Sequence, residues 1–278
     1  MRNGEGGGPW GNHGFPHAKR RAHRVQLAAH TYAFRHLPLD GALDSLAALG
    51  VGEVEVWLGH ATAGPDAVVR ALAERGLRAA AVSAGGFYDG DTDAPERAFA
   101  LAEALAAPVV VACLAPHVVG RIAARVPASL TLCVENHWDQ PLAGAGEVLE
   151  VLERTPRLAA CLDTGHALLA GERAEVFAER LGARLQHVHL KDARLPTRLE
   201  RVLGRRLRRR LLERPAPVHP GLGALDLPAL QRALARAGFA GTVTAEYEGP
   251  DAGAALGSLI HDWQAVADAS RRLGAEKR

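Results

Sequence analysis

The feature of this sequence that most limits its fold is a regular alternation of two kinds of segment. From residue 25 onward, apolar runs of six or seven residues alternate with longer Ala/Leu/Arg/Glu segments of helical period. Short runs rich in β-branched or small residues are typical of buried strands. Eight strands are expected, at 25–30, 53–58, 77–83, 108–114, 130–135, 157–163, 184–190 and 242–247.

The segments between the strands predict helices that surround a parallel sheet. Gly50, Gly76 and Gly238 follow three of them, as C-terminal caps do. Eight strand-helix units predict an α/β protein with one (β/α)₈ TIM barrel domain. A doubly wound open sheet would usually need fewer strands, and no glycine-rich fingerprint follows the first strand. The expected helices lie near 40–49, 65–75, 93–106, 117–125, 144–153, 172–182, 226–237 and 254–273.

Residues 1–24 do not share this alternation. They are rich in Gly, His and Arg without a hydrophobic period, so we expect a flexible basic tail over 1–24 and a catalytic barrel domain over 25–278. No apolar stretch approaches the roughly 18 residues of a membrane span, and no signal peptide is evident. The three cysteines lack the paired spacing of a disulfide scaffold. A cytoplasmic protein with no membrane partner is therefore expected.

Polar residues recur at the C-terminal ends of the later strands. Because alternate strand residues share a face, Glu135, Asp163, His189 and Glu246 end a face that otherwise carries Thr, Cys, Ala and His. Active sites of barrels gather at this end, and a buried carboxylate is costly unless it is paired or metal-bound. These four side chains suit one divalent ion of the Mn²⁺, Mg²⁺, Co²⁺ or Zn²⁺ type.

The spacing of these residues supports a shared site. Glu135 and Asp163 are 28 residues apart, and Asp163 and His189 are 26 apart, which is one strand-helix unit each. His189 and Glu246 are 57 apart, so an insertion of about one unit lies between them. The alternative interpretation is that each acidic residue merely caps the loop or helix after its strand. It explains one strand end well, but all four together poorly.

Five motifs occur in order along the chain: VENH (134–137), LDTGH (162–166), HVHLKD (187–192), PGLGALD (220–226) and AEYE (245–248). As a set over about 25–270, they resemble the xylose isomerase-like TIM barrel family of sugar phosphate isomerases and epimerases. This family also includes inosose dehydratase, hydroxypyruvate isomerase and endonuclease four. The resemblance implies that Glu135, Asp163, His189 and Glu246 bind the metal and that the partner is a small-molecule carbohydrate.

Further residues are expected to contact the substrate. The resemblance implies this role for His166, although a histidine at a helix start with no ligand role is the alternative. Lys191 and Asp192 end the seventh strand, where a plain salt bridge explains them nearly as well. His187 is expected to be a hydrogen-bonded barrel residue rather than a ligand, and Glu55 lies on the inward register of the second strand. The full set of expected substrate contacts is His166, Lys191, Arg194, His30 and Trp57.

The two glutamates suggest the chemistry. A metal that polarises a carbonyl and stabilises an enediolate would let Glu135 and Glu246 remove and return a proton, giving isomerisation or epimerisation. Dehydration of a cyclic polyol, as in inosose dehydratase, would use the same metal and base. An endonuclease-four-like abasic-site nuclease is less favoured, because the third strand ends in Ser83 and only His60 and His117 are nearby. A barrel that merely binds ligands is disfavoured because all four ligand types are present.

The insertion spans 193–220 and is expected at the catalytic mouth. Within it, 199–212 forms an amphipathic pattern with nine arginines and two glutamates over 194–214. A solvated or subunit-contacting helix is slightly favoured over a lid whose arginines attract a phosphorylated or carboxylated substrate. Nucleic acid is a disfavoured partner, and a homo-oligomer is allowed. The tail over 1–24 carries net +4 and residues 194–214 carry net +7. The overall net charge of +2 therefore leaves net −9 for the rest of the barrel.

Overall fold

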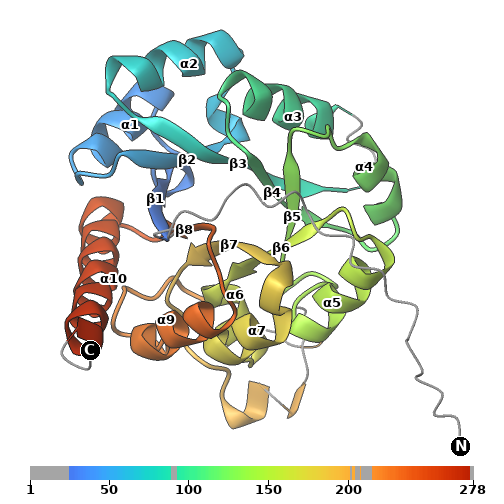
Figure 1. Ribbon diagram of the computed structural model, residues 1–278, viewed down its shortest axis with the longest axis vertical. Coiled ribbons are helices and arrows are strands. Elements are labelled where there is room, and N and C mark those ends of the chain that lie inside the picture. Colours follow the sequence, from blue (N-terminus) through green and yellow to red (C-terminus); the bar gives the residue numbers. More distant parts are fainter. Residues whose placement is uncertain (1–24, 89–92, 201, 204–206, 208–214, 276–278) are drawn as a thin grey trace, which may run out of the picture.

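The computed structural model describes residues 25–88, 93–200, 202–203, 207 and 215–275. Eight parallel strands form one closed barrel in chain order, with β8 hydrogen-bonded to β1 (Figure 1). This confirms the predicted (β/α)₈ barrel. The strands are β1 (Gln26–His30), β2 (Glu53–Trp57), β3 (Arg78–Phe87), β4 (Val109–Leu114), β5 (Thr131–Glu135), β6 (Ala159–Asp163), β7 (Leu185–Leu190) and β8 (Thr242–Ala245).

The helices form an outer ring around the barrel (Figure 1). Gly50, Gly76 and Gly238 follow α1, α2 and α9 with φ values of +74°, +64° and +67°, which glycine adopts without steric cost. The helices are α1 (Leu39–Ala47), α2 (Pro65–Glu74), α3 (Ala94–Ala104), α4 (Val119–Arg125), α5 (Ala145–Arg154), α6 (Thr164–Ala170), α7 (Ala174–Leu181), α9 (Leu227–Arg236) and α10 (Ala252–Ala275), with short 3₁₀ turns η1 (Thr31–Phe34), η2 (Leu58–His60) and η3 (Gly182–Arg184).

Three elements differ from the sequence expectation. Strand β3 continues four residues past the expected end, to Phe87, through a register shift between Ser83 and Gly86. Strand β8 ends at Ala245, so Glu246 follows the strand instead of lying within it. Helix α6 was not expected, because its seven residues are too few to show a helical period.

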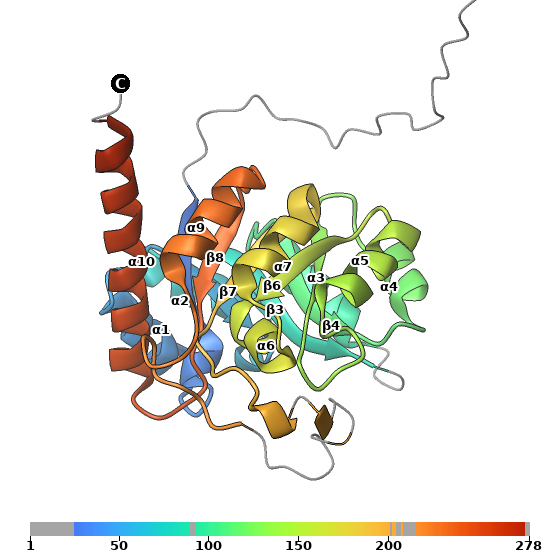
Figure 2. The ribbon, with the colours of Figure 1, turned by 90° about the horizontal axis from the view of Figure 1, so that it is seen from below.

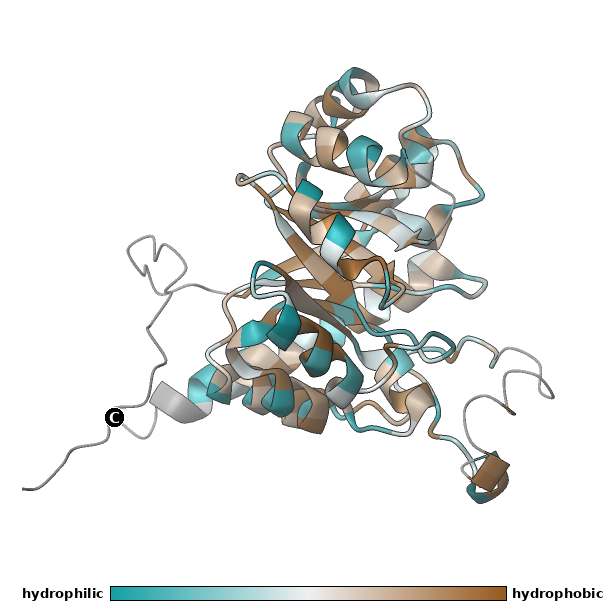
Figure 3. Ribbon diagram, turned by 90° about the vertical axis from the view of Figure 1, so that its right-hand side faces the viewer, coloured by the Kyte–Doolittle hydropathy of each residue, from teal (hydrophilic) through white to brown (hydrophobic). Residues whose placement is uncertain are grey.

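The described residues contain three hydrophobic clusters, of which two form the core of the barrel. Apolar residues on the outward face of the strands pack against the helices in one large cluster, and Figure 3 shows hydrophobic residues concentrated there. Inside the barrel, a small cluster of Val111, Cys133, Ala159 and Cys161 fills the space between β4, β5 and β6. The thiols are free, in agreement with the absence of a disulfide pattern. Small side chains here leave room for the polar residues at the strand ends.

The insertion after β7 lies at the end of the barrel toward which the strands point (Figure 2). Residues 198–200, 202–203 and 207 are helical. Thr197 and Glu200 cap this start reciprocally, since the backbone N–H of each donates to the other's side-chain oxygen. All six arginines of 199–212 lie outside the described residues, as does the expected tail over 1–24. Among the described helices, none is both long enough and apolar enough to cross a membrane.

Candidate metal centre

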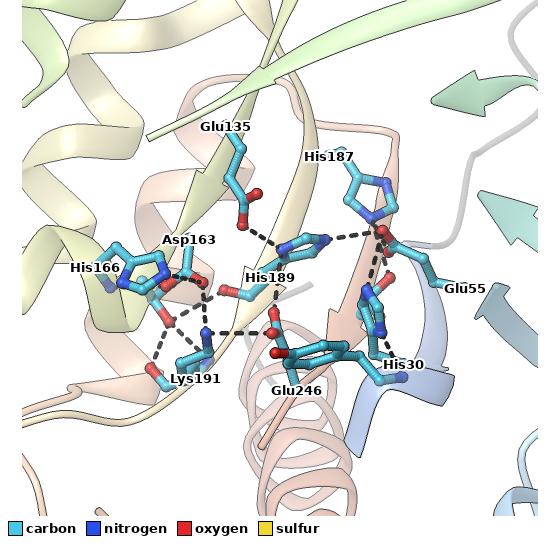
Figure 4. A network of polar contacts seen from close by, with 12 residues as sticks. His30, Glu55, Glu135, Asp163, His166, His187, His189, Lys191 and Glu246 are labelled. Carbon is cyan, nitrogen blue, oxygen red and sulfur yellow. Dashed lines mark hydrogen bonds and ion pairs between the residues drawn. The ribbon is translucent and has the colours of Figure 1, made fainter. Parts of the chain in front are cut away.

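The barrel brings the four expected ligands into one buried cluster. Glu135, Asp163, His189 and Glu246 come from β5, β6, β7 and the residue after β8, and each offers a ligand atom within 4.8 Å of the others. The pairing of Asp163 with His189 across β6 and β7 places two of them side by side. All four side chains are at least nine-tenths buried (Figure 4).

His189 lies at the centre of the cluster. Its Nδ1 atom is 2.8 Å from Glu135 Oε1 and 3.1 Å from Glu246 Oε2. Because β5 and β8 are separated by two strands, the two glutamates approach the imidazole from different sides. The thiol of Cys113, on β4, donates to Glu135 Oε2 at 3.3 Å and so helps to orient that carboxylate.

Asp163 uses its two oxygens differently. Oδ1 accepts the backbone N–H of His166 at 2.7 Å and so caps helix α6. The capping interpretation from the sequence is therefore correct for this residue, but it accounts for one oxygen. Oδ2 faces the cluster and makes no hydrogen bond. One carboxylate thus anchors a helix with Oδ1 and still presents Oδ2, which has an ion pair with Lys191 but no hydrogen bond, to the site.

Lys191 places an ammonium group against the carboxylates. Its Nζ atom lies 3.0 Å from Asp163 Oδ2, 3.2 Å from Glu246 Oε1 and 2.6 Å from Glu248 Oε1. The side chain crosses the start of α6 at Gly165, where an added Cβ would lie 2.8 Å from Lys191 Cγ. The glycine of the LDTGH motif therefore gives the lysine its path to the site.

The electrostatics of the cluster follow from burial and charge. Burial raises the pKa of Asp163 to about 7, the carboxylates of Glu246 and Glu135 add to the rise, and Lys191 opposes it. Burial would also raise the pKa of Glu246, but Lys191 and His189 hold it well below its usual range. Burial lowers the pKa of His189, yet the surrounding thiol and carboxylates raise it well above 6.5.

These observations indicate that the residues fit a divalent cation. Asp163 Oδ2 and Glu246 Oε2 are buried without a hydrogen bond, although charged nitrogens lie within about 3 Å. Three carboxylates and one imidazole are oxygen and nitrogen donors of the kind that Mn²⁺, Mg²⁺, Co²⁺ and Zn²⁺ accept. A cation among them would satisfy both free oxygens and reduce the repulsion that raises the Asp163 pKa.

A cavity beside the cluster contains two of the expected substrate contacts. His166 and Lys191 line it, with residues 215–218 of the insertion forming part of its wall. Burial and the neighbouring Lys191 hold the pKa of His166 well below 6.5, so its ring is neutral. Its Nδ1 atom is buried without a hydrogen bond. His166 therefore combines a neutral ring with one nitrogen that makes no hydrogen bond within the protein.

The other three expected contacts lie elsewhere. The guanidinium of Arg194 binds both oxygens of Glu200 at 2.7 and 2.6 Å in the insertion. Trp57 packs edge-on against Tyr32 and lines a different cleft, between α2 and α3. His30 is buried deeper in the barrel, with Nε2 3.6 Å from Glu55 Oε1. Substrate contact by these three residues stays a prediction.

The structure adds residues that the sequence did not single out as site residues. The ring of His137 lies against that of His166, with centroids 3.8 Å apart and the ring planes tilted by 49°. His137 lines the same cavity, as does Glu248. The Asn136 amide joins β5 to β6, because it donates to the carbonyl of Asp163 and accepts that residue's N–H. All three belong to the VENH and AEYE motifs. Their position in a motif could have marked them as candidate site residues. The sequence could not have shown which residues they contact.

Asp192 anchors the loop that closes the insertion. Its carboxylate accepts four backbone N–H groups, from Ala193, Gly221, Gly223 and Leu225, at 2.8 to 3.1 Å. Gly223 is required here, since a Cβ would overlap the Asp192 carboxylate. Asp192 therefore has a structural role of the kind that the sequence left open.

A closed parallel barrel with such an acidic cluster at its C-terminal mouth defines a (β/α)₈ protein with a candidate metal centre. The chain belongs to the xylose isomerase-like TIM barrel family, whose model matches residues 43–273. No curated protein sequence matches the chain.

Solved structures share the fold at low sequence identity. An L-ribulose 3-epimerase is 16% identical over 91% of this chain and 97% of its own, with a TM-score of 0.70. The probable 3-DHS dehydratase AsbF of Bacillus anthracis is 15% identical over 85% and 98%, with a TM-score of 0.67. A 3-keto-D-glucoside 4-epimerase of E. coli is 14% identical over 87% and 100%, with a TM-score of 0.66.

Proposed function

We propose that the chain is a divalent-metal-dependent isomerase or epimerase that acts on a sugar, sugar phosphate or related polyol. One observation carries the proposal: Glu135 and Glu246 converge on His189 Nδ1 from different sides, at 2.8 and 3.1 Å. Two carboxylates that flank one point can serve opposite faces of the same carbon atom. Epimerisation requires this arrangement, because a proton leaves one face and returns to the other.

The residues of the chain would act as follows. Glu135, Asp163, His189 and Glu246 would hold the ion, which supplies Lewis-acid polarisation of the substrate carbonyl. Glu246, ionised because its pKa lies well below the usual range, is a base ready to take the proton next to that carbonyl. Glu135 would have to start protonated and would deliver that proton to the other face of the same carbon; Glu246 would then lose the proton it took, and Glu135 would regain one, before the next turnover. Return to the neighbouring carbon gives isomerisation instead.

The cavity residues position the substrate. Neutral His166 offers a free Nδ1 as an acceptor for a sugar hydroxyl, and the Lys191 ammonium donates to an oxygen of either substrate or product. The relatives named above act on carbohydrates or related compounds according to their names, which supports this class of substrate.

Dehydration is the second candidate. The observation that favours it is the position of Lys191, which lines the cavity and whose Nζ lies 3.0 Å from Asp163 Oδ2 and 3.2 Å from Glu246 Oε1. A charged ammonium in the cavity can protonate a departing hydroxyl. An abasic-site nuclease is disfavoured, because neither described metal-compatible cluster includes His60 or His117.

The test is metal analysis of the purified protein followed by incubation with a panel of ketoses in D₂O. Deuterium at the carbon next to the carbonyl supports an isomerase or epimerase, whereas loss of water supports a dehydratase. Bound metal without turnover or exchange on any substrate would contradict both reactions and favour a binding module.

We predict that Glu246→Gln lowers kcat by at least about 100-fold, because it removes a proton-transfer group from the site. Turnover and metal content are measured together on the best substrate of the panel. Glu53→Gln is the matched control, since Glu53 pairs with Arg78 at the opposite end of β2. Full turnover with full metal content in Glu246→Gln would overturn the proposed role.

A further inference from the structure

A fully buried carboxylate lies beneath the candidate metal ligands without belonging to them. Glu55, on β2, is 0% exposed and faces three imidazoles (Figure 4). Its Oε2 is 2.7 Å from His187 Nε2, and its Oε1 is 3.0 Å from His189 Nε2 and 3.6 Å from His30 Nε2. All three rings thus turn the same nitrogen toward one carboxylate.

The two nitrogens of His189 have separate partners. Nε2 faces Glu55, while Nδ1 faces Glu135 and Glu246. A carboxylate can only accept, so the hydrogen-bonded Nε2 carries a hydrogen. Nδ1 likewise faces a carboxylate, Glu135, so without an ion both ring nitrogens can carry a hydrogen. When an ion takes the place of the hydrogen on Nδ1, the remaining hydrogen stays on Nε2, against Glu55. A metal ion binds the lone pair, so the contact with Glu55 selects the nitrogen that can serve as a ligand.

The neighbours of Glu55 hold it in this orientation. His30 accepts the backbone N–H of Tyr32 on Nδ1 at 2.9 Å, which leaves the hydrogen on Nε2, the atom facing Glu55. His187 Nδ1 is buried without a partner, so its hydrogen also belongs on Nε2. Three imidazole nitrogens thus surround the Glu55 carboxylate in the barrel interior and hold it in place.

A second cation among His30, Glu55 and His189 is the competing interpretation, since their ligand atoms also lie within 4.8 Å of one another. Such an ion would need lone pairs on the Nε2 atoms that face Glu55. The Tyr32 N–H already occupies the lone pair of His30 Nδ1, so Nε2 of the neutral ring is a donor. The geometry therefore favours a hydrogen-bonded network over a second ion.

We propose that Glu55 is a positioning residue of the metal centre, which holds His189 in the tautomer whose Nδ1 binds the ion. The inference rests on the proposed function, because the centre formed by Glu135, Asp163, His189 and Glu246 is itself proposed. It adds a specific dependence: the affinity for metal is set in part by a side chain that does not touch the metal.

The main variant is Glu55→Met, which removes both acceptors at similar volume. Zn²⁺ affinity, measured by competition with a chelator, is expected to fall by about 10- to 100-fold. Glu55→Gln restores one acceptor oxygen and should recover part of the loss. The matched control is Thr244→Val, which removes the hydroxyl 3.0 Å from His187 Nε2 in the same layer and leaves Glu55 in place. It should change Zn²⁺ affinity by less than about threefold.

The second measurement needs no variant. Nitrogen-15 spectra of histidine-labelled wild-type protein loaded with Zn²⁺ should show His189 bound through Nδ1 with a hydrogen on Nε2. Binding through Nε2, unchanged affinity in Glu55→Met, or two Zn²⁺ ions per chain with no hydrogen on His189 Nε2 would overturn the proposal. Absence of any divalent ion binding by wild type would instead refute the proposed metal centre. In that case, spectra of the metal-free protein still test the Nε2 contact with Glu55.

Discussion

Asp192 shows how one side chain can determine the shape of a loop. Four backbone N–H groups converge on its carboxylate, and three of them belong to the segment that returns from the insertion. The backbone after Pro220 is thereby drawn against the end of β7. Since Lys191 is the preceding residue, the same short stretch of chain presents an ammonium to the cluster and fastens the loop beside it.

We predict that Asp192→Ala destabilises the protein by about 2–4 kcal/mol, because four N–H groups lose a charged acceptor. Urea unfolding measures the change. Limited proteolysis should show faster cleavage within 193–225. Asp226→Ala is the control, since Asp226 accepts one N–H as the N-cap of α9 and its loss should cost about 1 kcal/mol. Equal losses in the two variants would contradict the anchoring role.

At the scale of elements, helix α6 packs against the side chain that reaches the site. It begins directly at Asp163, so the strand ends and the helix starts at the same residue. Gly165, in its first turn, lies under the Lys191 side chain. Strand β6, helix α6 and the end of β7 are therefore held together by a close contact that leaves no space for a Cβ.

Gly165→Ala is predicted to destabilise the protein by about 1–3 kcal/mol, because the added methyl group overlaps the lysine stem in a packed site. Gly120→Ala in α4 is the matched control, since nothing lies within 4 Å of an added Cβ there. It should be neutral or stabilise by up to about 1 kcal/mol. The comparison of the two unfolding free energies decides, and a neutral Gly165→Ala would refute the contact.

The alternation of apolar runs and helical segments in the sequence predicted the strands and most of the helices. Strands with alternate faces were located to within a few residues, and the barrel followed from their number. The pattern also placed Glu135, Asp163 and His189 on one inward face, because period 2 records the face of each residue. Glu246 was expected on the strand and lies just past its end, yet it still reaches the cluster.

What the pattern could not predict is which residues meet across the barrel. Glu55 and His187 are 132 residues apart and on strands that are not neighbours, so no local period links them. The contact of His137 with His166 likewise depends on how two loops fold over the strand ends. Helix α6 was missed because a capped helix of seven residues carries too few apolar positions to define a face.

At the scale of the whole molecule, the charge is unevenly divided. The insertion segment 194–214 carries nine arginines against two glutamates, and the sequence outside it and outside 1–24 is net −9. Three of the barrel's carboxylates lie in one buried cluster contributed by four consecutive strands or strand ends. Residues from half of the strands therefore meet where three carboxylates repel one another, and in this structure Lys191 is a cation that offsets part of that repulsion.

A divalent ion is consequently expected to stabilise the entire fold. At a concentration 100 times its Kd, Mn²⁺ should raise the free energy of unfolding by about 2.7 kcal/mol, and removal by EDTA should reverse the gain. Thermal unfolding with and without the ion measures this. Asp66→Asn, at the exposed start of α2, should keep the full shift, whereas Asp163→Ala should lose most of it. An equal shift in Asp163→Ala would mean that the ion binds elsewhere.

Residues 215–218 form part of the cavity wall and come from a different part of the chain than the candidate metal ligands. The four candidate ligands lie at the ends of β5 to β8, so a change in strand register would move them apart. The wall belongs to an inserted segment that is tied to the barrel at Asp192 and contains Pro215 and Pro217, whose rings limit its backbone. A change confined to 215–218 would therefore reshape the wall of the cavity and leave the strand residues of the cluster in place.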